Sequence, residues 1–296
     1  MKGKIIVIEG TDCSGKETQS KLLENKLIGI GLKCIRFEFP NYDSPTGKIV
    51  GGAYLGKEEI SKSLFAEGAP NVDPYIACLY YAADRKYNIG KINKYLDDGY
   101  CVIIDRYTTS NMAHQGGKIH DKEKRFFMYQ WIDKLEYWLL QLPKPDITIF
   151  LHMPYEYTKE LRKNRINIDE HEKSEDHLRN AEEAYIELSE LYNWSKVECV
   201  NEDQIKTIEE INDEILNILK KKESIDSFYV LFMICGWGTV GVGGCCCVIC
   251  WGWGLVWFMI WGWLFLLDCC IILKADFTLE VITGVEAVSL AIGLDD

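Results

Sequence analysis

Residues 4–16 read KIIVIEGTDCSGK, and this stretch decides the fold. Its first part, Lys4–Ile8, is a short apolar run that predicts a buried β-strand. The run leads through Glu9 into a turn with glycines at both ends, Gly10 and Gly15, and Lys16 then opens a predicted helix. A glycine-rich turn between a strand and a helix is the context of a phosphate-binding loop, because backbone N–H groups and the helix N-terminus surround phosphate oxygens there. The stretch therefore predicts binding of a nucleoside triphosphate.

The loop defines the expected ATP site. Its residues and the two that follow are Gly10, Thr11, Asp12, Cys13, Ser14, Gly15, Lys16, Glu17 and Thr18. Such loops usually have Ser or Thr after the lysine, as a ligand of Mg²⁺, where this chain has Glu17. A glutamate can bind Mg²⁺ through its carboxylate, or it can point away from the phosphates, and both alternatives stay open.

Outward from the loop, strands alternate with helices up to residue 222. Four more strands are expected, at Lys33–Phe39, Cys101–Ile104, Asp146–Leu151 and Val197–Val200. Apolar periodicity and Gly or Pro breaks predict helices at 16–30, 47–55, 73–96, 122–142, 155–165, 175–193 and 204–222. This alternation predicts an α/β fold of the P-loop NTPase type, a five-stranded parallel sheet with flanking helices. Ligands of such sheets bind at the carboxyl ends of the strands.

A second motif, Asp105-Arg106-Tyr107, stands where the third strand ends. A carboxylate at this place can hold Mg²⁺, and an arginine can bind a phosphate through two N–H groups. Taken alone, the motif could also be a surface ion pair near a strand end. Asp12 and Asp105 are the candidate metal ligands.

Six blocks of sequence occur in the order typical of one kinase family. They are residues 6–19 (IVIEGTDCSGKETQ), 39–42 (FPNY), 80–85 (YYAADR), 105–115 (DRYTTSNMAHQ), 142–151 (LPKPDITIFL) and 169–185 (DEHEKSEDHLRNAEEAY). With these blocks the chain resembles thymidylate kinase over about residues 1–222. The resemblance implies transfer of the γ-phosphoryl group of Mg-ATP to dTMP.

The resemblance also implies roles for the acceptor site. Asp12 would approach the sugar 3′-hydroxyl and the metal, and Tyr42 and Arg106 would hold the acceptor phosphate. The side chains expected around the base and the sugar are Phe39 and Tyr81 as flat rings beside the pyrimidine, Arg85 and Asn111 as readers of the base, and His114 near the 2′ position. His114 stands where the family usually has an aromatic residue that crowds the 2′ position, so the choice between deoxyribose and ribose stays open.

A mobile lid is expected to complete the catalytic site. Phosphoryl transfer spreads negative charge over three oxygens, so catalysis depends on positioned cations. This phosphate loop offers Cys13 and Ser14 and no arginine. The resemblance therefore makes Arg162 and Arg165, three residues apart before the lid, catalytic candidates beside Lys16. It further implies that Asp169 and Glu172 close against the loop or the sugar. A solvated basic helix is the alternative for the two arginines.

Composition limits the other functions. The formal net charge of −12 argues against binding a nucleic-acid polymer, which needs a basic face. The five histidines, at 114, 120, 152, 171 and 177, show no metal-ligand spacing such as HExxH. The N-terminus shows no signal-peptide pattern, so we expect a cytoplasmic kinase domain.

The chain changes character near residue 225. Residues 226–296 contain one basic residue, six of the nine Trp and seven of the twelve Cys, and residues 227–267 carry no charge. We therefore separate a kinase-like domain, 1–225, from an apolar tail, 226–296. Two interpretations of the tail stay open. It is a membrane anchor, since 227–267 is longer than the roughly 20 residues of one spanning helix, or it is a non-native extension from a wrong reading frame or gene boundary.

The sequence thus predicts a dTMP kinase that uses Mg²⁺ and ATP. The resemblance adds a homodimer. Two alternatives remain: a kinase for another nucleoside monophosphate such as UMP or CMP, and a membrane-associated nucleotide-binding protein without turnover, in which Glu17 has removed the metal ligand.

Overall fold

The computed structural model describes residues 2–163 and 169–222. Five parallel strands form its central sheet, in the order β2-β3-β1-β4-β5. This confirms the predicted sheet. The strands are β1 (Lys4–Gly10), β2 (Cys34–Glu38), β3 (Cys101–Asp105), β4 (Ile147–His152) and β5 (Ser195–Glu198). Because β1 lies in the middle, between β3 and β4, the phosphate loop emerges at the centre of the carboxyl edge.

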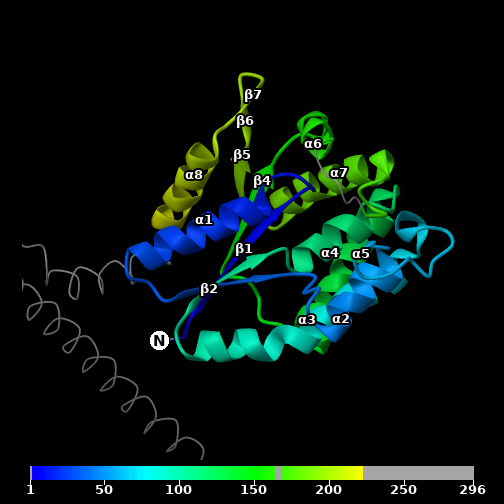
Figure 1. Cartoon of the computed structure of the whole chain (residues 1–296), viewed down its shortest axis with the longest axis horizontal. Coiled ribbons are helices and arrows are strands. Elements are labelled where there is room, and N and C mark those ends of the chain that lie inside the picture. The colour runs from blue at the N-terminus through cyan, green and yellow to red at the C-terminus, as the bar shows by residue number, and fades with distance from the viewer. Residues whose placement is uncertain (1, 164–168, 223–296) are drawn as a thin grey trace, which may run out of the picture. The chain divides into compact units, whose positions relative to one another are not determined.

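Helices cover both faces of the sheet, as Figure 1 shows. They are α1 (Lys16–Gly29), α2 (Pro45–Lys48), α3 (Pro74–Asp97), α4 (Thr108–Gly116), α5 (Lys122–Asp133), α6 (Tyr155–Arg162), α7 (Glu175–Leu191) and α8 (Ile208–Lys221). Shorter helical turns are η1 (Ile49–Tyr54), η2 (Ala69–Asn71) and η3 (Lys134–Leu139). η1 and η3 are wound more widely than an α-helix, with i→i+5 hydrogen bonds.

The core lies in layers on the two sides of the sheet because side chains alternate along each strand. Ile6 and Ile8 of β1 point to one face and pack with apolar residues of α1 and α8. Ile5 and Val7 point to the other face and pack with α3. Beside α3, the helices α4, α5 and α7 form a third cluster around Phe150. The carboxyl edge of the sheet, between these layers, holds the residues that line the cavity described below.

Two elements differ from the predicted pattern. The helix α4 was not expected, because the sequence TTSNMAHQG has no apolar period. All nine of its residues are buried, and polar contacts of its first turn add to the apolar packing of Met112 and Ala113 in holding it in place. The other difference is a hairpin, β6 (Val200–Asn201) with β7 (Gln204–Ile205), which delays the last helix to Ile208.

Close packing requires the glycine at the end of α4. A Cβ atom at Gly116 would lie 2.2 Å from Cε1 of Tyr129, well inside van der Waals contact.

The apolar segment 227–267 and Arg165 lie outside the described residues. Among the residues that are described, no helix has the length and apolar character to cross a membrane.

Candidate functional site

The phosphate loop has the backbone shape that its glycines predict. Gly10 has φ +156°, and a Cβ there would lie 2.5 Å from Oγ of Ser14 and 2.8 Å from the carbonyl oxygen of Leu151. Gly15 has φ +85° and stands as the N-cap of α1. Lys16 follows at once, and its ammonium folds over the loop to donate to the carbonyl oxygen of Thr11 at 2.6 Å. The loop is thus built to present N–H groups and one cation at the helix N-terminus.

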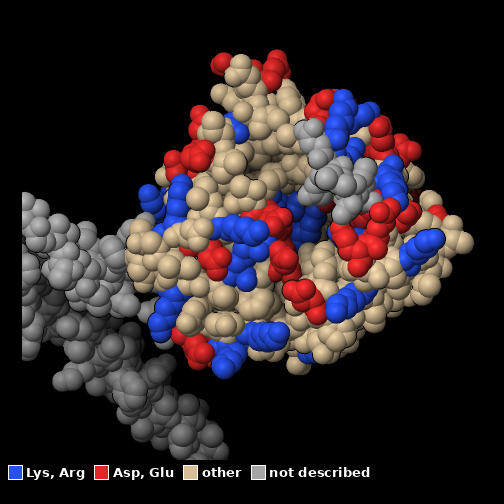
Figure 2. Space-filling model, in the orientation of Figure 1, with Lys and Arg blue, Asp and Glu red and all other residues tan. Residues whose placement is uncertain are grey.

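A cavity of about 480 Å³ opens at this edge of the sheet. Figure 2 shows the hollow, with acidic and basic side chains around it. Most of the predicted site residues line it: Asp12, Cys13, Gly15, Lys16, Glu17, Thr18, Phe39, Tyr42, Tyr81, Asp105, Arg106, His114, Asp169 and Glu172. Other residues that line the cavity were not predicted from the sequence, among them Glu38, Lys57, Ser110 and His171. One cavity therefore joins the phosphate loop to the expected acceptor residues.

Arg106 is the central cation of the cavity wall. Its backbone is in the left-handed region, with φ +63°, directly after β3. Its Nη2 forms an ion pair with Asp12, and its Nη1 lies 3.3 Å from Nε2 of His114. Burial alone would raise the pKa of Asp12, but Arg106, His114 and Lys16 bring it well below its ordinary value. Asp12 is therefore ionised at neutral pH, which keeps it available to a metal or a hydroxyl.

Positive charge gathers around Lys16. Its side chain is buried, and burial together with Arg106 lowers the pKa of Lys16 to about 8. Asp12, Asp105 and Glu9 oppose this shift. At neutral pH the ammonium still carries its proton for the most part, and an added anion would hold it more firmly.

Glu9 is a positioning residue that the sequence did not predict. It is the penultimate residue of β1 and is fully buried, and its carboxylate accepts hydrogen bonds from the start of α4. The donors are the N–H groups of Tyr107 and Ser110, the hydroxyls of Thr109 and Ser110, and the hydroxyl of Tyr185. The only sequence signal was a carboxylate at the end of an apolar strand. Glu9 fixes α4, and with it Arg106 and His114, to the phosphate loop.

Three aromatic rings line the cavity, those of Phe39, Tyr42 and Tyr81. Phe39 and Tyr81 are predicted to flank a flat base, and Tyr42 is predicted to hold the acceptor phosphate. The ammonium of Lys57 lies 4.6 Å from the centre of the Tyr42 ring. Lys57 thereby adds a cation to the rim of this aromatic wall.

The predicted base readers Arg85 and Asn111 do not line the cavity. Arg85 is almost fully buried, and its Nε and Nη2 donate to the carboxylate of Glu136 at 2.5 and 2.6 Å. Asn111 donates to the same carboxylate at 2.8 Å. Its Oδ1 has no hydrogen-bond partner among residues 2–163 and 169–222. Glu136, which the sequence analysis did not single out, thus joins the two side chains.

The structure describes only one of the two arginines that were predicted to act from the lid, Arg162. Arg162, at the end of α6, is buried; its Nη2 lies 3.5 Å from the hydroxyl of Tyr155, and it does not line the cavity. Arg165 falls within the undescribed residues 164–168. Asp169 and Glu172 do line the cavity, and the Asp169 carboxylate accepts from the N–H groups of His171 and Glu172 at 3.0 Å. Burial, Asp12 and Glu172 raise the pKa of Asp169 to about 6.

The donor set fits a hard divalent cation. Asp12 follows β1, Asp105 is the last residue of the neighbouring strand β3, and both line the cavity. Carboxylate oxygens are what Mg²⁺ prefers. Glu17 also lines the cavity, but its side chain is 61% exposed, against 15% for Asp12 and 9% for Asp105. All three carboxylates form ion pairs, and the deeper burial of Asp12 and Asp105 makes them better placed than Glu17 for the metal.

Comparison with known proteins agrees with this geometry. The sequence model of the family described as thymidylate kinase matches residues 8–215. A thymidylate kinase from Prochlorococcus marinus is 35% identical over 224 residues, which are 75% of this chain and all of the relative. A probable thymidylate kinase from Pyrococcus horikoshii is 30% identical over 226 residues, 74% of this chain and 97% of the relative.

A solved structure extends the similarity from sequence to fold. The thymidylate kinase of Candida albicans superposes with a TM-score of 0.57 at 25% identity, over 75% of this chain and 93% of that one. The family model matches the part of the chain that contains the phosphate loop and the cavity residues, and the relatives are similar over about three quarters of the chain. The chain belongs to the thymidylate kinase family.

Proposed function

We propose that this protein transfers the γ-phosphoryl group of ATP to dTMP and forms dTDP and ADP. The observation that carries the proposal is the cavity that joins Lys16 and Arg106, which lie together at the phosphate loop, to the ring of Tyr81. A donor nucleotide bound at the loop and an acceptor nucleotide bound beside Tyr81 would meet at these two cations. Membership of the thymidylate kinase family supports dTMP as the acceptor.

The chemistry asks the protein for positioning and positive charge. Lys16 would contact the β- and γ-phosphates of ATP from the loop. Arg106, together with Tyr42, would hold the phosphate of dTMP, and its ion pair with Asp12 keeps the guanidinium in place beforehand. Asp12 and Asp105 would hold Mg²⁺, which neutralises phosphate charge when bound. Arg162 and Arg165 would supply lid cations.

Recognition of the base would use the Asn111–Glu136–Arg85 group. Thymine presents a donor, N3–H, beside an acceptor, O4. The unpartnered Oδ1 of Asn111 suits the donor, and the remaining N–H groups of Arg85 suit the acceptor. Cytosine has an acceptor at N3 and would leave the Asn111 oxygen unsatisfied, which costs binding energy.

The test is ADP release by the full-length chain with Mg-ATP and each of dTMP, dUMP, UMP and CMP. The proposal expects the highest kcat/KM for dTMP. Preference for UMP or CMP would keep the mechanism and overturn the substrate, with His114 the first position to change. Tight ATP binding with no turnover on any acceptor would instead favour a binding protein, and recovery of turnover in Glu17→Thr would trace the loss to the missing metal ligand.

A homodimer through α3, α5 and η3 is the second part of the proposal. Ile76, Leu79 and Tyr87 form one exposed stripe along α3, with exposed fractions of 48%, 49% and 61%. Phe127 of α5 and Trp138 of η3 are also exposed, at 57% and 71%. The rings of Tyr75 and Trp131 are 5.1 Å apart, so the two helices meet there. A surface this apolar is typical of an interface between proteins.

The last part concerns residues 227–267, which lie outside the described structure. Membrane contact through this segment follows from its sequence alone, and Lys220, Lys221 and Lys222 before it would keep the kinase domain on the cytoplasmic side. Extraction of cell membranes with alkaline carbonate tests it. Retention of the full chain in the membrane pellet supports an anchor, whereas complete release opposes one.

A further inference from the structure

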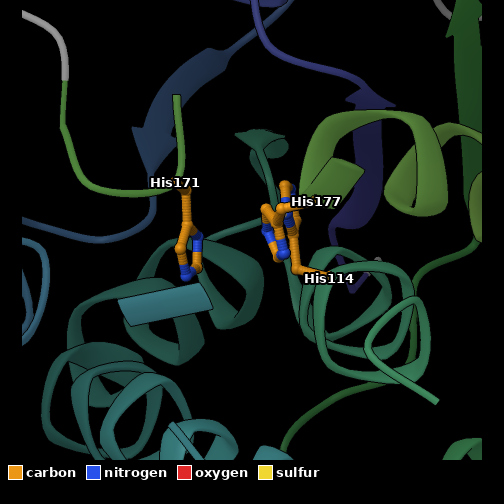
Figure 3. Close-up of side chains that lie close together, drawn as sticks. All are labelled: His114, His171 and His177. Carbon is orange, nitrogen blue, oxygen red and sulfur yellow. The ribbon is translucent and has the colours of Figure 1, made fainter. Parts of the chain in front are cut away.

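Three histidines from separate elements meet beside the cavity. His114 lies in the last turn of α4, His171 in the loop before α7, and His177 in the first turn of α7. One nitrogen from each ring lies within 4.8 Å of the others. Figure 3 shows the rings of His114 and His177 together and the ring of His171 to one side of them. The ring centres of His171 and His177 are 4.1 Å apart, and those of His114 and His177 are 5.4 Å apart.

We propose that His114, His171 and His177 form a binding site for a divalent transition-metal ion that prefers nitrogen ligands, such as Zn²⁺ or Ni²⁺. Three imidazoles with an open fourth position are a known ligand set for such ions. The site is separate from the carboxylates Asp12 and Asp105 that suit Mg²⁺, and it goes beyond the kinase reaction.

Geometry allows this coordination with small movements. A tetrahedral ion with metal–nitrogen distances near 2.0 Å holds its ligands roughly 3.3 Å apart. The ligand nitrogens, which lie up to 4.8 Å apart in the structure, must therefore approach one another by about 1.5 Å. His171 is on a loop rather than on a helix, so it can supply most of this shift. His114 and His177 already lie 3.2 Å apart, from Nδ1 to Nε2.

Metal binding requires a change of tautomer at His114. Arg106 can only donate, so Nε2 of His114 accepts, and Nδ1 of His114 then donates to His177. Burial lowers the pKa of all three rings well below the ordinary value, so each imidazole is neutral at neutral pH, which is the form that binds metals. Coordination through Nδ1 of His114 moves its proton to Nε2, and both the hydrogen bond to His177 and the contact of Nε2 with Arg106 are then exchanged for metal–nitrogen bonds.

Neighbouring charge selects the class of ion. Arg106 beside His114 and Lys118 near His171 oppose a cation, and Asp12 attracts one. A hard ion such as Mg²⁺, which gains little from imidazole, has no reason to enter. Ions late in the first transition series bind imidazole strongly enough to offset the two nearby cations. Because His114 and His171 line the cavity, an ion bound by the cluster would lie beside the space for the acceptor nucleotide.

Titration of the metal-free full-length chain with Co²⁺, in the absence of nucleotide, tests the site. We expect about one Co²⁺ per chain with visible d–d absorption, displaced by Zn²⁺. In His177→Gln and His171→Gln the affinity should fall at least about tenfold. His152→Gln is the matched control, since His152 is held by Glu182 and Glu198 at a distance from the cluster, and its affinity should equal that of the wild type.

The cysteines of the tail could also take up Co²⁺, and the spectrum separates the two sites. Thiolate ligands add a sulfur-to-cobalt charge-transfer band in the near ultraviolet, and three histidines do not. The proposal is overturned if the wild type shows only the sulfur band, binds no Co²⁺, or binds it as tightly as both cluster variants do. Thermal unfolding of each variant checks its folding, and a Zn²⁺-induced rise in the wild-type Tm that exceeds that of the cluster variants supports the site independently. Absence of kinase activity would leave this readout unaffected.

Discussion

Glu136 accepts two hydrogen bonds from Arg85, at 2.5 and 2.6 Å, and both side chains are almost completely buried. Both N–H groups lie on one edge of the guanidinium, so the contact fixes its plane as well as its charge. Asn111 donates to the same carboxylate. The Arg85–Glu136 pair therefore also holds Asn111, and removal of either charged partner leaves the other charge buried without a counter-ion.

We predict that Glu136→Gln lowers the free energy of unfolding by about 3 kcal/mol, because it leaves the Arg85 charge buried without a counter-ion. The KM for dTMP should rise while the KM for ATP stays the same. Urea denaturation and steady-state kinetics measure the two effects. Glu160→Gln is the control, since the ion pair of Glu160 with Lys163 is exposed and its loss should change stability by less than about 1 kcal/mol. An unchanged dTMP KM in a folded Glu136→Gln variant would contradict a role in the base site.

Lys16→Met should lower kcat by roughly 10²- to 10³-fold, because the loop then lacks its cation for the transferring phosphoryl group. Single-turnover kinetics with Mg-ATP and dTMP give the size of the effect. Lys26→Met on the same helix, which removes only an ion pair with Asp213, should keep kcat within about twofold of the wild type. Equal losses in both variants would point to damage of α1 rather than to catalysis.

Asp169 gives a pH dependence of stability. Its pKa is raised from 3.8 to about 6 in the folded chain, so the folded state binds its proton more tightly than the unfolded state does. The resulting stabilisation is complete below the unfolded pKa and is lost as the pH rises through about 6, by at most about 3 kcal/mol. Asp169→Asn should remove this loss, so its stability relative to the wild type should increase between about pH 4 and pH 7. Denaturation curves across this range measure it, and the exposed substitution Asp97→Asn should run parallel to the wild type.

The proposed dimer predicts that Leu79→Glu or Trp138→Glu shifts the protein from dimer to monomer. A charge in the middle of an apolar interface must be desolvated without a partner, which weakens association. Sedimentation velocity at micromolar concentration reports the change. Leu64→Glu is a matched control, because Leu64 is the most exposed of the large apolar side chains, at 81%, and lies outside these helices. The proposed interface is wrong if the wild type is a monomer, or if the Leu79→Glu and Trp138→Glu variants both remain dimers.

Most of the fold and the phosphate loop could be predicted from the local sequence. Lys4–Ile8 and the loop after it are consecutive in the chain, so their pattern alone predicts strand, turn and helix N-terminus. The structure confirms the five parallel strands. The helix α4 escaped prediction because its polar side chains are satisfied by partners distant in sequence, such as Glu9 and Tyr185, and only the folded chain brings these together.

The parts of the site built from distant residues could not be predicted in the same way. Glu136 lies in η3, where the wider helical turn departs from the 3.6-residue period, so its burial does not follow from the periodicity of residues 122–142. The histidine cluster joins residues 63 positions apart in its hydrogen bond, and no spacing rule covers such a gap. The roles of Arg162 and Arg165 stay predictions.

Glu9 has a consequence for anyone who would alter the acceptor specificity of this enzyme. A single carboxylate immediately before the phosphate loop satisfies donors from both α4 and α7. A graft of α4 from a kinase with another acceptor must therefore carry its own hydroxyls at positions 109 and 110. Without them Glu9 would keep only the N–H groups of positions 107 and 110 and the hydroxyl of Tyr185 as donors, and a change intended for the acceptor nucleotide would weaken the support of the phosphate loop.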